Sequence, residues 1–264
     1  MNNADEPVKE VFQPLPNVAR ENFKGFILFY LRLFFDIGSF TVYKDVKRYL
    51  ARTNKNVLEV GCGFKPYRYL VPAGVKYCGV DWIGAGNNFH CQAEDVIYYA
   101  GDILPLEDSS FDYLFHTEVL EHVYYLDQFL NECYRVLSEN GKMFFTIPFA
   151  ARNHYIPYDY WRLTPVSLEK LLVKAGFTHI LVRPRGADII VIIAKINVFF
   201  VRIIMRAMNN SVLSLINKVI FGSLFIIPII FNTLLGHILL FLRVGSVDDP
   251  LGYSVYCDKI GEYV

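Results

Sequence analysis

The sequence predicts an α/β fold in which helices cover both faces of a doubly wound, mostly parallel sheet. The first observation is the stretch from Asn56 to Asp81, where two apolar strands flank a glycine turn and a helical segment. The second is the alternation of strand-like and helix-like segments from there to Arg183. The third is the length, since 264 residues can bury a substantial core within one catalytic domain.

The elements follow in order along the chain. Residues 1 to 20 contain three prolines and read as an irregular lead-in, and Phe23 to Leu50 reads as helix, interrupted near Gly38-Ser39. The first half of this helix is apolar almost all round, which indicates packing over the sheet or membrane contact. We therefore assign residues 1–50 to an N-terminal lead-in with apolar helices and 51–186 to the core. Core strands are expected at 57–60, up to 81, 96–100, 111–116, 142–147 and near 179–183, with helices at 123–137 and 168–175.

The glycine turn and the carboxylate after the second strand point to a ligand. Gly61 and Gly63 lack a Cβ, so the chain can turn tightly and let a ligand approach the backbone. Asp81 follows about 20 residues on, the distance at which a carboxylate can accept hydrogen bonds from ribose hydroxyls. Phe64-Lys65-Pro66 replaces the third glycine of the dinucleotide fingerprint, which argues against a pyrophosphate. An adenosine-containing ligand is the simplest fit.

These residues also carry a family resemblance. The segment from Leu58 to Gly63 resembles the first motif of class I S-adenosylmethionine-dependent methyltransferases, and Asp81 resembles their second. Residues 101–106 with 110–112 are similar to the third motif, and 116–123 (HTEVLEHV) match the segment after strand four in the type 11 methyltransferase group. The resemblance runs from Asn56 to Phe177 and implies a seven-stranded Rossmann-like sheet, S-adenosyl-L-methionine as cofactor, and methyl transfer.

The same resemblance implies roles for individual residues. The backbone from Gly61 through Cys62 to Gly63 would cradle the methionine part of the cofactor. Side chains around it would place the amino group (Glu59), hold the ribose (Asp81), lie beside the adenine (Trp82), contact the adenine edge (Asp102, Ile103) and border the donor on the acceptor side (Glu118). Glu121 stands where a helix is expected to begin, so a role at the helix dipole fits it as well as a functional one.

The loop after strand five supplies the candidate catalytic residues. His154, Asp159 and Tyr160 lie in it among aromatic residues, and ligands of doubly wound sheets sit outside the carboxyl ends of the strands. His154 has the right free pKa for a general base on a hydroxyl. Alternatively, Asp159 and Arg162 only pair with each other. Transfer from a sulfonium is an in-line displacement that depends on positioning, so no metal is required.

An apolar insertion interrupts the core after the sixth strand. Ala187 to Met208 reads as an apolar helix with three basic residues, and no charged residue occurs between Lys218 and Arg243. That run exceeds the roughly 20 residues that cross a bilayer. Residues 253–260 resemble the seventh strand, however, and must rejoin the core, which excludes a single span. We assign 187–250 to the insertion and 251–264 to the last strand. Three arrangements fit: packing within the protein or a homodimer, an in-plane membrane anchor, or a re-entrant hairpin bent at Pro228.

Composition narrows the partners and the compartment. The net charge is zero and no basic block occurs, so nucleic acid is not an expected partner. The five cysteines include no CxxC pair, which fits reduced thiols in the cytosol. The polar, acidic start of the sequence does not read as a secretory signal. We expect a cytoplasmic protein, peripheral or monotopic at the inner membrane face if the insertion contacts lipid.

The acceptor is predicted from the aromatic loop and a second resemblance. A pocket lined by aromatic rings with a few polar groups suits a sugar or an aromatic hydroxyl. Residues 158–165 (YDYWRLTP), together with 61–67, look like a bacterial and archaeal subgroup associated with cell-surface polysaccharide assembly. The prediction is O-methylation of a sugar hydroxyl in a cell-surface glycan or lipid-linked precursor. The alternatives are a quinone, lipid or other small lipophilic acceptor, and a non-catalytic module that binds the donor.

Overall fold

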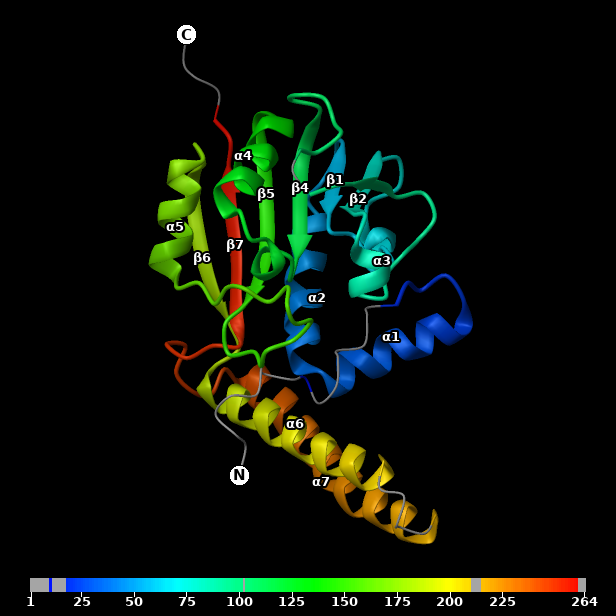
Figure 1. The fold of residues 1–264 in the computed structure, drawn as a ribbon. Helices are drawn as coiled ribbons and strands as arrows, with labels where there is room; N and C mark the ends of the chain where they lie inside the picture. Colours follow the sequence, from blue (N-terminus) through cyan, green and yellow to red (C-terminus); the bar gives the residue numbers. More distant parts are fainter. Residues whose placement is uncertain (1–9, 11–17, 102, 210–214, 261–264) are drawn as a thin grey trace.

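The structure is a computed structural model that describes residues 10, 18–101, 103–209 and 215–260, and its centre is one seven-stranded sheet (Figure 1). The strand order is β3-β2-β1-β4-β5-β7-β6. β7 runs antiparallel to both of its neighbours, and all other neighbouring strands are parallel. The strands are β1 (Val57–Val60), β2 (Tyr77–Trp82), β3 (Ile97–Tyr99), β4 (Phe111–Thr117), β5 (Leu137–Pro148), β6 (Thr178–Arg185) and β7 (Gly252–Asp258). The predicted fold class is confirmed, including the return of the chain into a seventh strand.

Successive residues of the central strands point to opposite faces of the sheet, and each face has its own hydrophobic core. Leu114 and Phe145 point to the face covered by α4 (Leu126–Val136) and α5 (Pro165–Lys174). Phe115 and Phe144 point to the face covered by α1 (Phe23–Phe35) and α2 (Ile37–Leu50). This is the period of two that a strand buried on both faces requires. The sheet is thus covered by helices on both faces.

Two local predictions are corrected. Between β1 and β2 the chain forms only the 3₁₀ turn η1 (Arg68–Leu70), where a longer helical segment was expected. Pro66 and Pro72 bracket this turn, and a proline supplies no N–H to an intrahelical hydrogen bond. The break between α1 and α2 falls at Asp36, before the expected Gly38-Ser39, because the Asp36 side chain caps α2 by accepting a hydrogen bond from the amide of Ser39.

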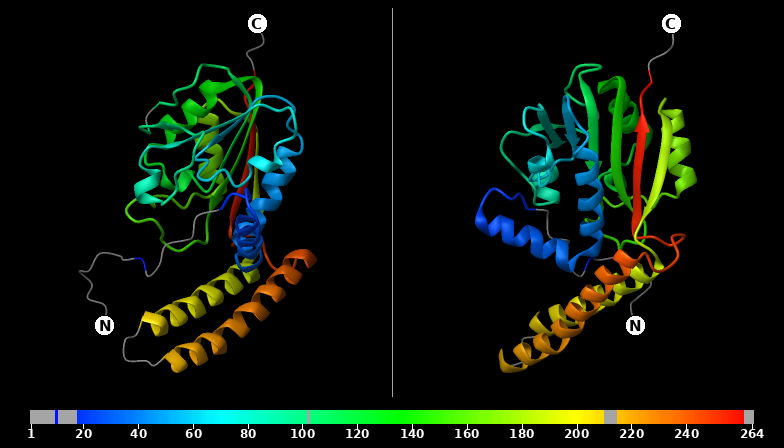
Figure 2. Two further views of the ribbon diagram at one scale, coloured as in Figure 1. Left: turned by 90° about the vertical axis from the view of Figure 1, so that its right-hand side faces the viewer. Right: turned by 180° about the vertical axis from the view of Figure 1, so that it is seen from behind.

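The insertion is a pair of helices, α6 (Asp188–Asn209) and α7 (Leu215–Leu242), that extends away from the sheet (Figures 1 and 2). The helices are antiparallel: the Asn197 amide donates to the Thr233 hydroxyl at 3.1 Å, and Gly236 packs close to Ile193 nearer the core. α7 continues through Pro228, so a hairpin bent at Pro228 is wrong. The helix packs on α6 on both sides of the proline, through Phe225 against Phe200 and through Thr233 with Asn197. The residues between the helices lie outside the described part of the chain.

The end of the helix pair nearest the sheet is firmly attached, whereas much of α7 is uncovered. Ile37, Ile190 and Ile193 form a small buried cluster there. His237 contacts the carbonyl oxygen of Phe34 at 2.9 Å through Nε2, which ties α7 to α1. Residues Gly222–Leu242 of α7 are long and apolar enough to cross a membrane, and only 17% of that window is buried.

Candidate active site

The glycine loop after β1 is held by Asp81 at the end of β2. Gly61 and Gly63 have φ values of 66° and 52°, in the left-handed region that favours glycine. The Gly63 amide donates to Oδ2 of Asp81 at 2.8 Å, and the Trp82 amide donates to Oδ1 at 2.8 Å. Asp81 is therefore in a position to fix the shape of the loop. Both oxygens keep a second lone pair for a ligand, so binding of ribose by Asp81 stays a prediction.

Glu59 and Cys62 lie beneath this loop. The Glu59 carboxylate is buried and accepts a hydrogen bond from the Tyr77 hydroxyl. Burial raises its pKa to about 8, partly offset by that hydrogen bond. Cys62 is buried as well. The structure thus gives Glu59 a partner within the protein, and its contact with the amino group of the cofactor stays a prediction.

Trp82 begins a row of aromatic rings beside the loop. Its indole N–H donates to the carbonyl oxygen of Ala100 at 3.2 Å, and its ring lies 5.3 Å from that of Tyr158 and 6.0 Å from that of Phe89, centroid to centroid. Ile103 is exposed, as an adenine contact would require. Asp102 falls outside the described residues.

Glu118 has an ion-pair partner that the sequence did not reveal. Its Oε1 accepts a hydrogen bond from Nη2 of Arg185 at 2.7 Å. Arg185 ends β6 and is buried. Its Nη1 donates to the Thr41 hydroxyl, its Nε to the carbonyl oxygen of Tyr253 in β7, and Nη2 also to the carbonyl oxygen of Ile147 in β5. Glu118 itself has a φ of 53°, a strained conformation for a residue with a Cβ. The side chain is therefore fixed in place at the carboxyl end of β4.

The loop after β5 brings His154 and Asp159 together. The Arg162 guanidinium donates to both oxygens of Asp159 at 2.7 and 2.8 Å, and the His154 amide donates to Oδ2 at 2.9 Å. Burial alone would raise the pKa of Asp159, but these hydrogen bonds outweigh it and lower the pKa. Nδ1 of the His154 ring lies 3.3 Å from the same oxygen. Asp159 is thus held in its charged form and is placed to orient His154.

A catalytic role for Tyr160 stays a prediction, and the structure places its side chain beside Tyr124. Its ring packs edge-on against Tyr124 with 5.2 Å between centroids, and both rings are exposed. Its backbone amide donates to the carbonyl oxygen of Glu121 at 2.9 Å. In an irregular loop, alternation does not tell which way a side chain points, so the sequence could not separate Tyr160 from its neighbours.

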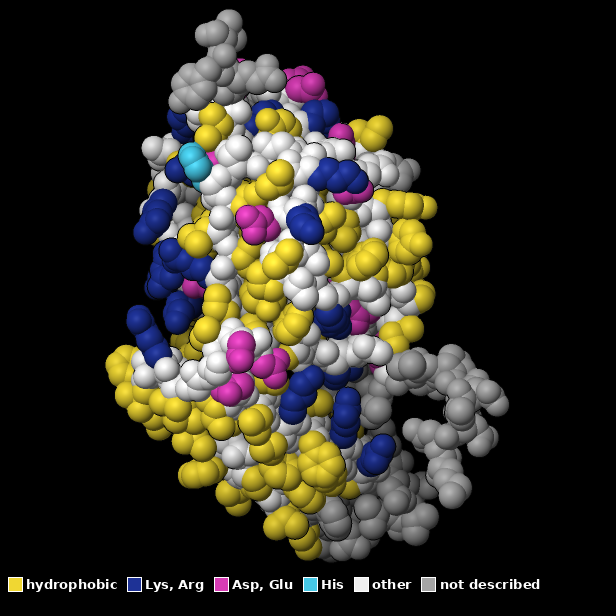
Figure 3. Space-filling model, turned by 90° about the vertical axis from the view of Figure 1, so that its left-hand side faces the viewer, with side chains coloured by type: hydrophobic (Ala, Val, Ile, Leu, Met, Phe, Trp, Pro, Cys, Tyr) yellow, Lys and Arg dark blue, Asp and Glu magenta, His cyan; other side chains and the backbone are white. Residues whose placement is uncertain are grey.

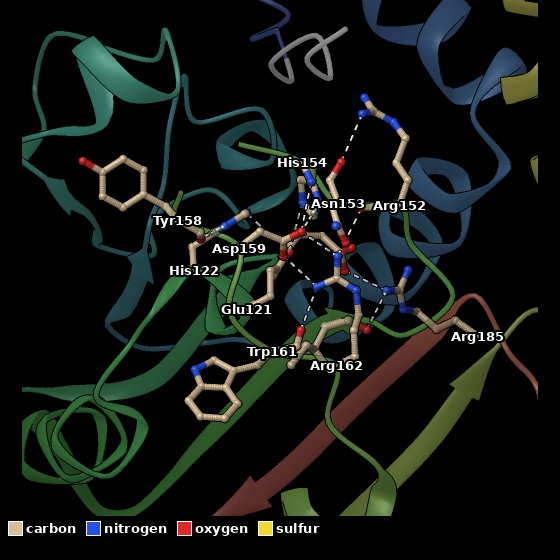
Figure 4. A network of polar contacts seen from close by, with 12 residues as sticks. Glu121, His122, Arg152, Asn153, His154, Tyr158, Asp159, Trp161, Arg162 and Arg185 are labelled. Carbon is tan, nitrogen blue, oxygen red and sulfur yellow. Dashed lines mark hydrogen bonds and ion pairs between the residues drawn. The ribbon is translucent and has the colours of Figure 1, made fainter. Parts of the chain in front are cut away.

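Glu121 and His122 are the functional candidates that sequence reasoning undervalued. They lie in the 3₁₀ turn η2 (Leu120–His122), and α4 begins only at Leu126, so a role for Glu121 at the helix dipole is wrong. Glu121 is fully buried, and neither of its oxygens has a hydrogen-bond partner among the described residues. His122 and His154 point toward it from two sides (Figure 4). Burial raises the pKa of Glu121 well above its usual value and lowers that of His122 to about 4.

The sheet order, the glycine loop after β1 and the carboxylate after β2 define the class of the protein, because this is the class I S-adenosylmethionine-dependent methyltransferase fold. Residues 58–145, about a third of the chain, match the family model described as Methyltransferase domain. The chain therefore carries a type 11 methyltransferase domain, and it is an S-adenosylmethionine-dependent methyltransferase in this general sense.

Two solved structures show the same fold, and a third is a weaker match. A SAM-dependent methyltransferase from Archaeoglobus fulgidus is 18% identical with a TM-score of 0.51, over 83% of this chain and 93% of that one. A SAM-dependent methyltransferase from Thermotoga maritima is 15% identical with a TM-score of 0.51, over 90% and 98% of the two chains. Phosphoethanolamine N-methyltransferase 2 of Haemonchus contortus, crystallised with S-adenosyl-L-methionine, is 15% identical with a TM-score of 0.46, and the match covers 83% of this chain but 52% of that one. No curated protein sequence matches the chain.

Proposed function

We propose that the protein transfers the methyl group of S-adenosylmethionine to a sugar hydroxyl of a cell-surface glycan or its lipid-linked precursor, at the cytoplasmic surface of a membrane. The proposed location at a membrane rests on the position of the helix pair relative to the site. β6 and β5 are both antiparallel to β7, so they are parallel to each other. The carboxyl end of β6, where α6 follows, therefore lies at the sheet edge that holds Asp81 and Glu118. The helix pair and the site share one end of the molecule (Figure 1).

The surface of the helix pair supports contact with lipid headgroups and acyl chains. Large apolar side chains cover the face of the helix pair that Figure 3 shows. On α7, Ile227, Phe231 and Phe241 are 67%, 65% and 85% exposed. The basic residues of α6 are Lys195, Arg202 and Arg206, spaced seven and four residues apart and so on one side of the helix. An apolar helix beside a basic stripe is typical of anchors that lie in the plane of an anionic membrane.

The reaction needs a donor held in line with the acceptor oxygen. A lone pair of the hydroxyl oxygen forms the new C–O bond as the C–S bond of the donor breaks. The electrons of the C–S bond stay on sulfur, so the sulfonium becomes a neutral thioether. The hydroxyl proton must also leave. The loop of Gly61 and Gly63, clamped by Asp81, would hold the donor. The cluster of Glu121, His122 and His154 would promote loss of the proton on the acceptor side.

Aromatic rings around this cluster favour a sugar. Phe89 lies within 6.0 Å of His122, Tyr155 and Tyr158, measured between ring centroids. Rings beside a few polar groups suit the apolar faces and hydroxyls of a carbohydrate. A quinone or lipid acceptor is the second candidate, because α1 also exposes apolar side chains, including Phe23 at 79%.

Vesicle sedimentation tests the membrane contact. The purified chain should sediment with phosphatidylglycerol vesicles more than with phosphatidylcholine vesicles. The double variant Ile227→Glu/Phe231→Glu should lose at least about tenfold in partitioning, since charges at the apolar face are costly there. Val173→Glu is the matched control, because Val173 is 60% exposed on α5 and should leave partitioning unchanged. A monodisperse chain that binds neither vesicle type, or a homodimer that buries α7, would contradict the proposed membrane anchor.

The acceptor is tested in a deletion strain. Glycan and lipid fractions from the strain, incubated with the purified enzyme and methyl-labelled donor, should take up label in the glycan or lipid-linked glycan fraction. Label in the quinone or simple lipid fraction instead would favour the second candidate. Wild-type extracts serve as the control, since their acceptor positions are already methylated.

A further inference from the structure

Three side chains that can bind a metal ion meet on the acceptor side of the site. Nε2 of His122 lies 3.6 Å from Oε1 of Glu121, and Nε2 of His154 lies 3.8 Å from the same oxygen. One ligand atom from each of the three residues lies within 4.8 Å of the other two. η2 supplies Glu121 and His122, and the loop after β5 supplies His154. The site thus joins two segments at the carboxyl ends of β4 and β5 (Figure 4).

Both imidazoles are oriented as metal ligands. Nδ1 of His122 lies 2.6 Å from the carbonyl oxygen of Tyr158, and a carbonyl can only accept, so Nδ1 carries the proton. Nδ1 of His154 lies 3.1 Å from the carbonyl oxygen of Arg152 and 3.3 Å from the Asp159 carboxylate, which gives it the same tautomer. Each ring therefore directs the lone pair of Nε2 toward Glu121. Metal-binding histidines are oriented in this way, with the other ring nitrogen donating to a carbonyl or carboxylate.

Glu121 lacks the partner that its burial requires. Its side chain is fully buried and both oxygens are without a hydrogen bond among the described residues. The two imidazoles do not satisfy it, because they face it with lone pairs. The neighbouring carboxylates are engaged elsewhere, Glu118 with Arg185 and Asp159 with Arg162. A cation between the three side chains would accept one lone pair from each of them.

We propose that Glu121, His122 and His154 bind one divalent transition-metal ion on the acceptor side of the methyl donor. Two imidazole nitrogens and one carboxylate oxygen suit Zn²⁺, Fe²⁺ and similar ions better than Mg²⁺ or Ca²⁺. Ligands about 2.1 Å from such an ion stand about 3.0 to 3.4 Å apart. The observed separations of 3.6 and 3.8 Å lie just above this range, and all three ligand atoms lie within 4.8 Å of one another. Three protein ligands leave positions open for an exogenous oxygen.

The role of the ion rests on the proposed function. Val119 lies between Glu118 and the metal cluster in sequence, and its side chain packs against Gly61 of the donor loop. An acceptor hydroxyl bound at an open position of the ion would therefore lie beside the donor. The ion would favour the deprotonated oxygen, with the proton released to water, and the oxygen lone pair would then form the C–O bond as the C–S bond breaks. His154 would be a metal ligand in this scheme, and not the general base.

Metal binding is tested on the full chain, independently of any acceptor. After treatment with a chelator, the protein is titrated with Co²⁺ by calorimetry and by visible absorption, with S-adenosylmethionine binding measured in parallel. We expect one Co²⁺ per chain in wild type, and at least about tenfold weaker binding in Glu121→Gln and in His154→Ala. His179→Ala is the matched control, because this exposed histidine pairs with Asp258 at the amino end of β6, at the opposite edge of the sheet from the cluster. It should bind Co²⁺ as wild type does.

The outcomes separate this inference from the proposed function. Weaker Co²⁺ binding in both variants, with donor affinity within about twofold of wild type, supports the site. Absence of one-to-one binding in wild type, or unchanged binding in both variants, overturns it. Methyl transfer to a glycan that persists after chelation overturns the role of the ion and leaves the proposed function intact. Saturable metal binding without transfer to any glycan supports the metal site and contradicts the proposed acceptor.

Discussion

The donor region, formed by β1, β2 and the loops that follow them, differs from the acceptor region, formed by η2 and residues 149–164. In the donor region, Asp81 accepts two backbone hydrogen bonds and Glu59 accepts one from Tyr77. In the acceptor region, Glu121 is just as buried but has no hydrogen bond among the described residues. The donor region is thus already shaped for its ligand, whereas the acceptor region contains a buried carboxylate and two histidine lone pairs that need a partner.

This difference suggests how the two ligands are bound. A preformed loop loses little conformational freedom when it binds a cofactor, and the same cofactor is used in every turnover. An unsatisfied carboxylate is costly, and it is retained where function requires it. The best test is therefore a pair of matched substitutions, one at a hydrogen-bonded carboxylate and one at an unpartnered carboxylate, that should change stability in opposite directions.

The largest effect is expected for Gly61→Ala. A Cβ at Gly61 would lie 2.4 Å from Cγ2 of Val119, and the φ of 66° disfavours any residue with a Cβ. We expect affinity for S-adenosylmethionine to fall at least about 100-fold, a loss of about 2.7 kcal/mol, measured by calorimetry. Gly74→Ala separates the two causes, because Gly74 has a φ of 83° and nothing within 4 Å of its Cβ position. That control should lose about 1 kcal/mol of stability and keep its affinity. Equal effects in the two variants would show that the contact with Val119 is unimportant.

Much of the donor region could be predicted from the sequence, because its constraints are local. Gly61 and Gly63 are required by the backbone itself, and Asp81 follows from the length of one βαβ unit. The alternation of Leu114 and Phe115 between the two cores follows from the geometry of a strand. The helical segment between β1 and β2 was wrong, because two prolines were weighed less than the usual pattern of the unit.

The acceptor region could be predicted only in part, because its contacts are distant in sequence or lie in irregular backbone. Arg185 pairs with Glu118 across 67 residues, and nothing near Arg185 indicates that partner. The loop after β5 has no periodicity, so Tyr160 was grouped with His154 although its ring packs on Tyr124. Glu121 was visible in the motif, but only the structure shows its burial and its missing partner.

A second prediction compares two isosteric changes of a carboxylate to an amide. Asp81→Asn should destabilise the metal-free protein by about 1–2 kcal/mol, because the new NH₂ group faces a backbone N–H. Glu121→Gln should stabilise it by a similar amount, because the new NH₂ group can donate to the lone pairs on Nε2 of His122 or His154. Unfolding in urea, with the chelator present, measures both. If both variants changed stability in the same direction, the proposed difference between the donor and acceptor regions would be contradicted.

A third prediction concerns His116, a buried histidine of β4 that stands outside both regions. Its ring stacks on Phe145 with 4.6 Å between centroids, and it contacts Phe129 edge-on. Burial among these rings lowers its pKa to about 3, so the native state binds a proton there less readily than the unfolded state does. Its contribution to stability is therefore complete above the unfolded pKa near 6.5 and declines as the pH falls toward 3. At pH 5 the loss is about 2 kcal/mol.

His116→Phe should remove this loss, because the phenyl ring can keep the stacking and carries no titratable group. The free energy of unfolding in urea, measured at pH 7.5 and pH 5, should fall less for the variant than for wild type by about 2 kcal/mol. His179→Phe is the control, since this exposed histidine of β6 should leave the difference between the two pH values nearly unchanged. If His116→Phe keeps the full wild-type loss, the acid sensitivity arises elsewhere, and His122 becomes the first residue to substitute because burial lowers its pKa to about 4. The source of the acid sensitivity would then lie in the acceptor region and not in the core around β4.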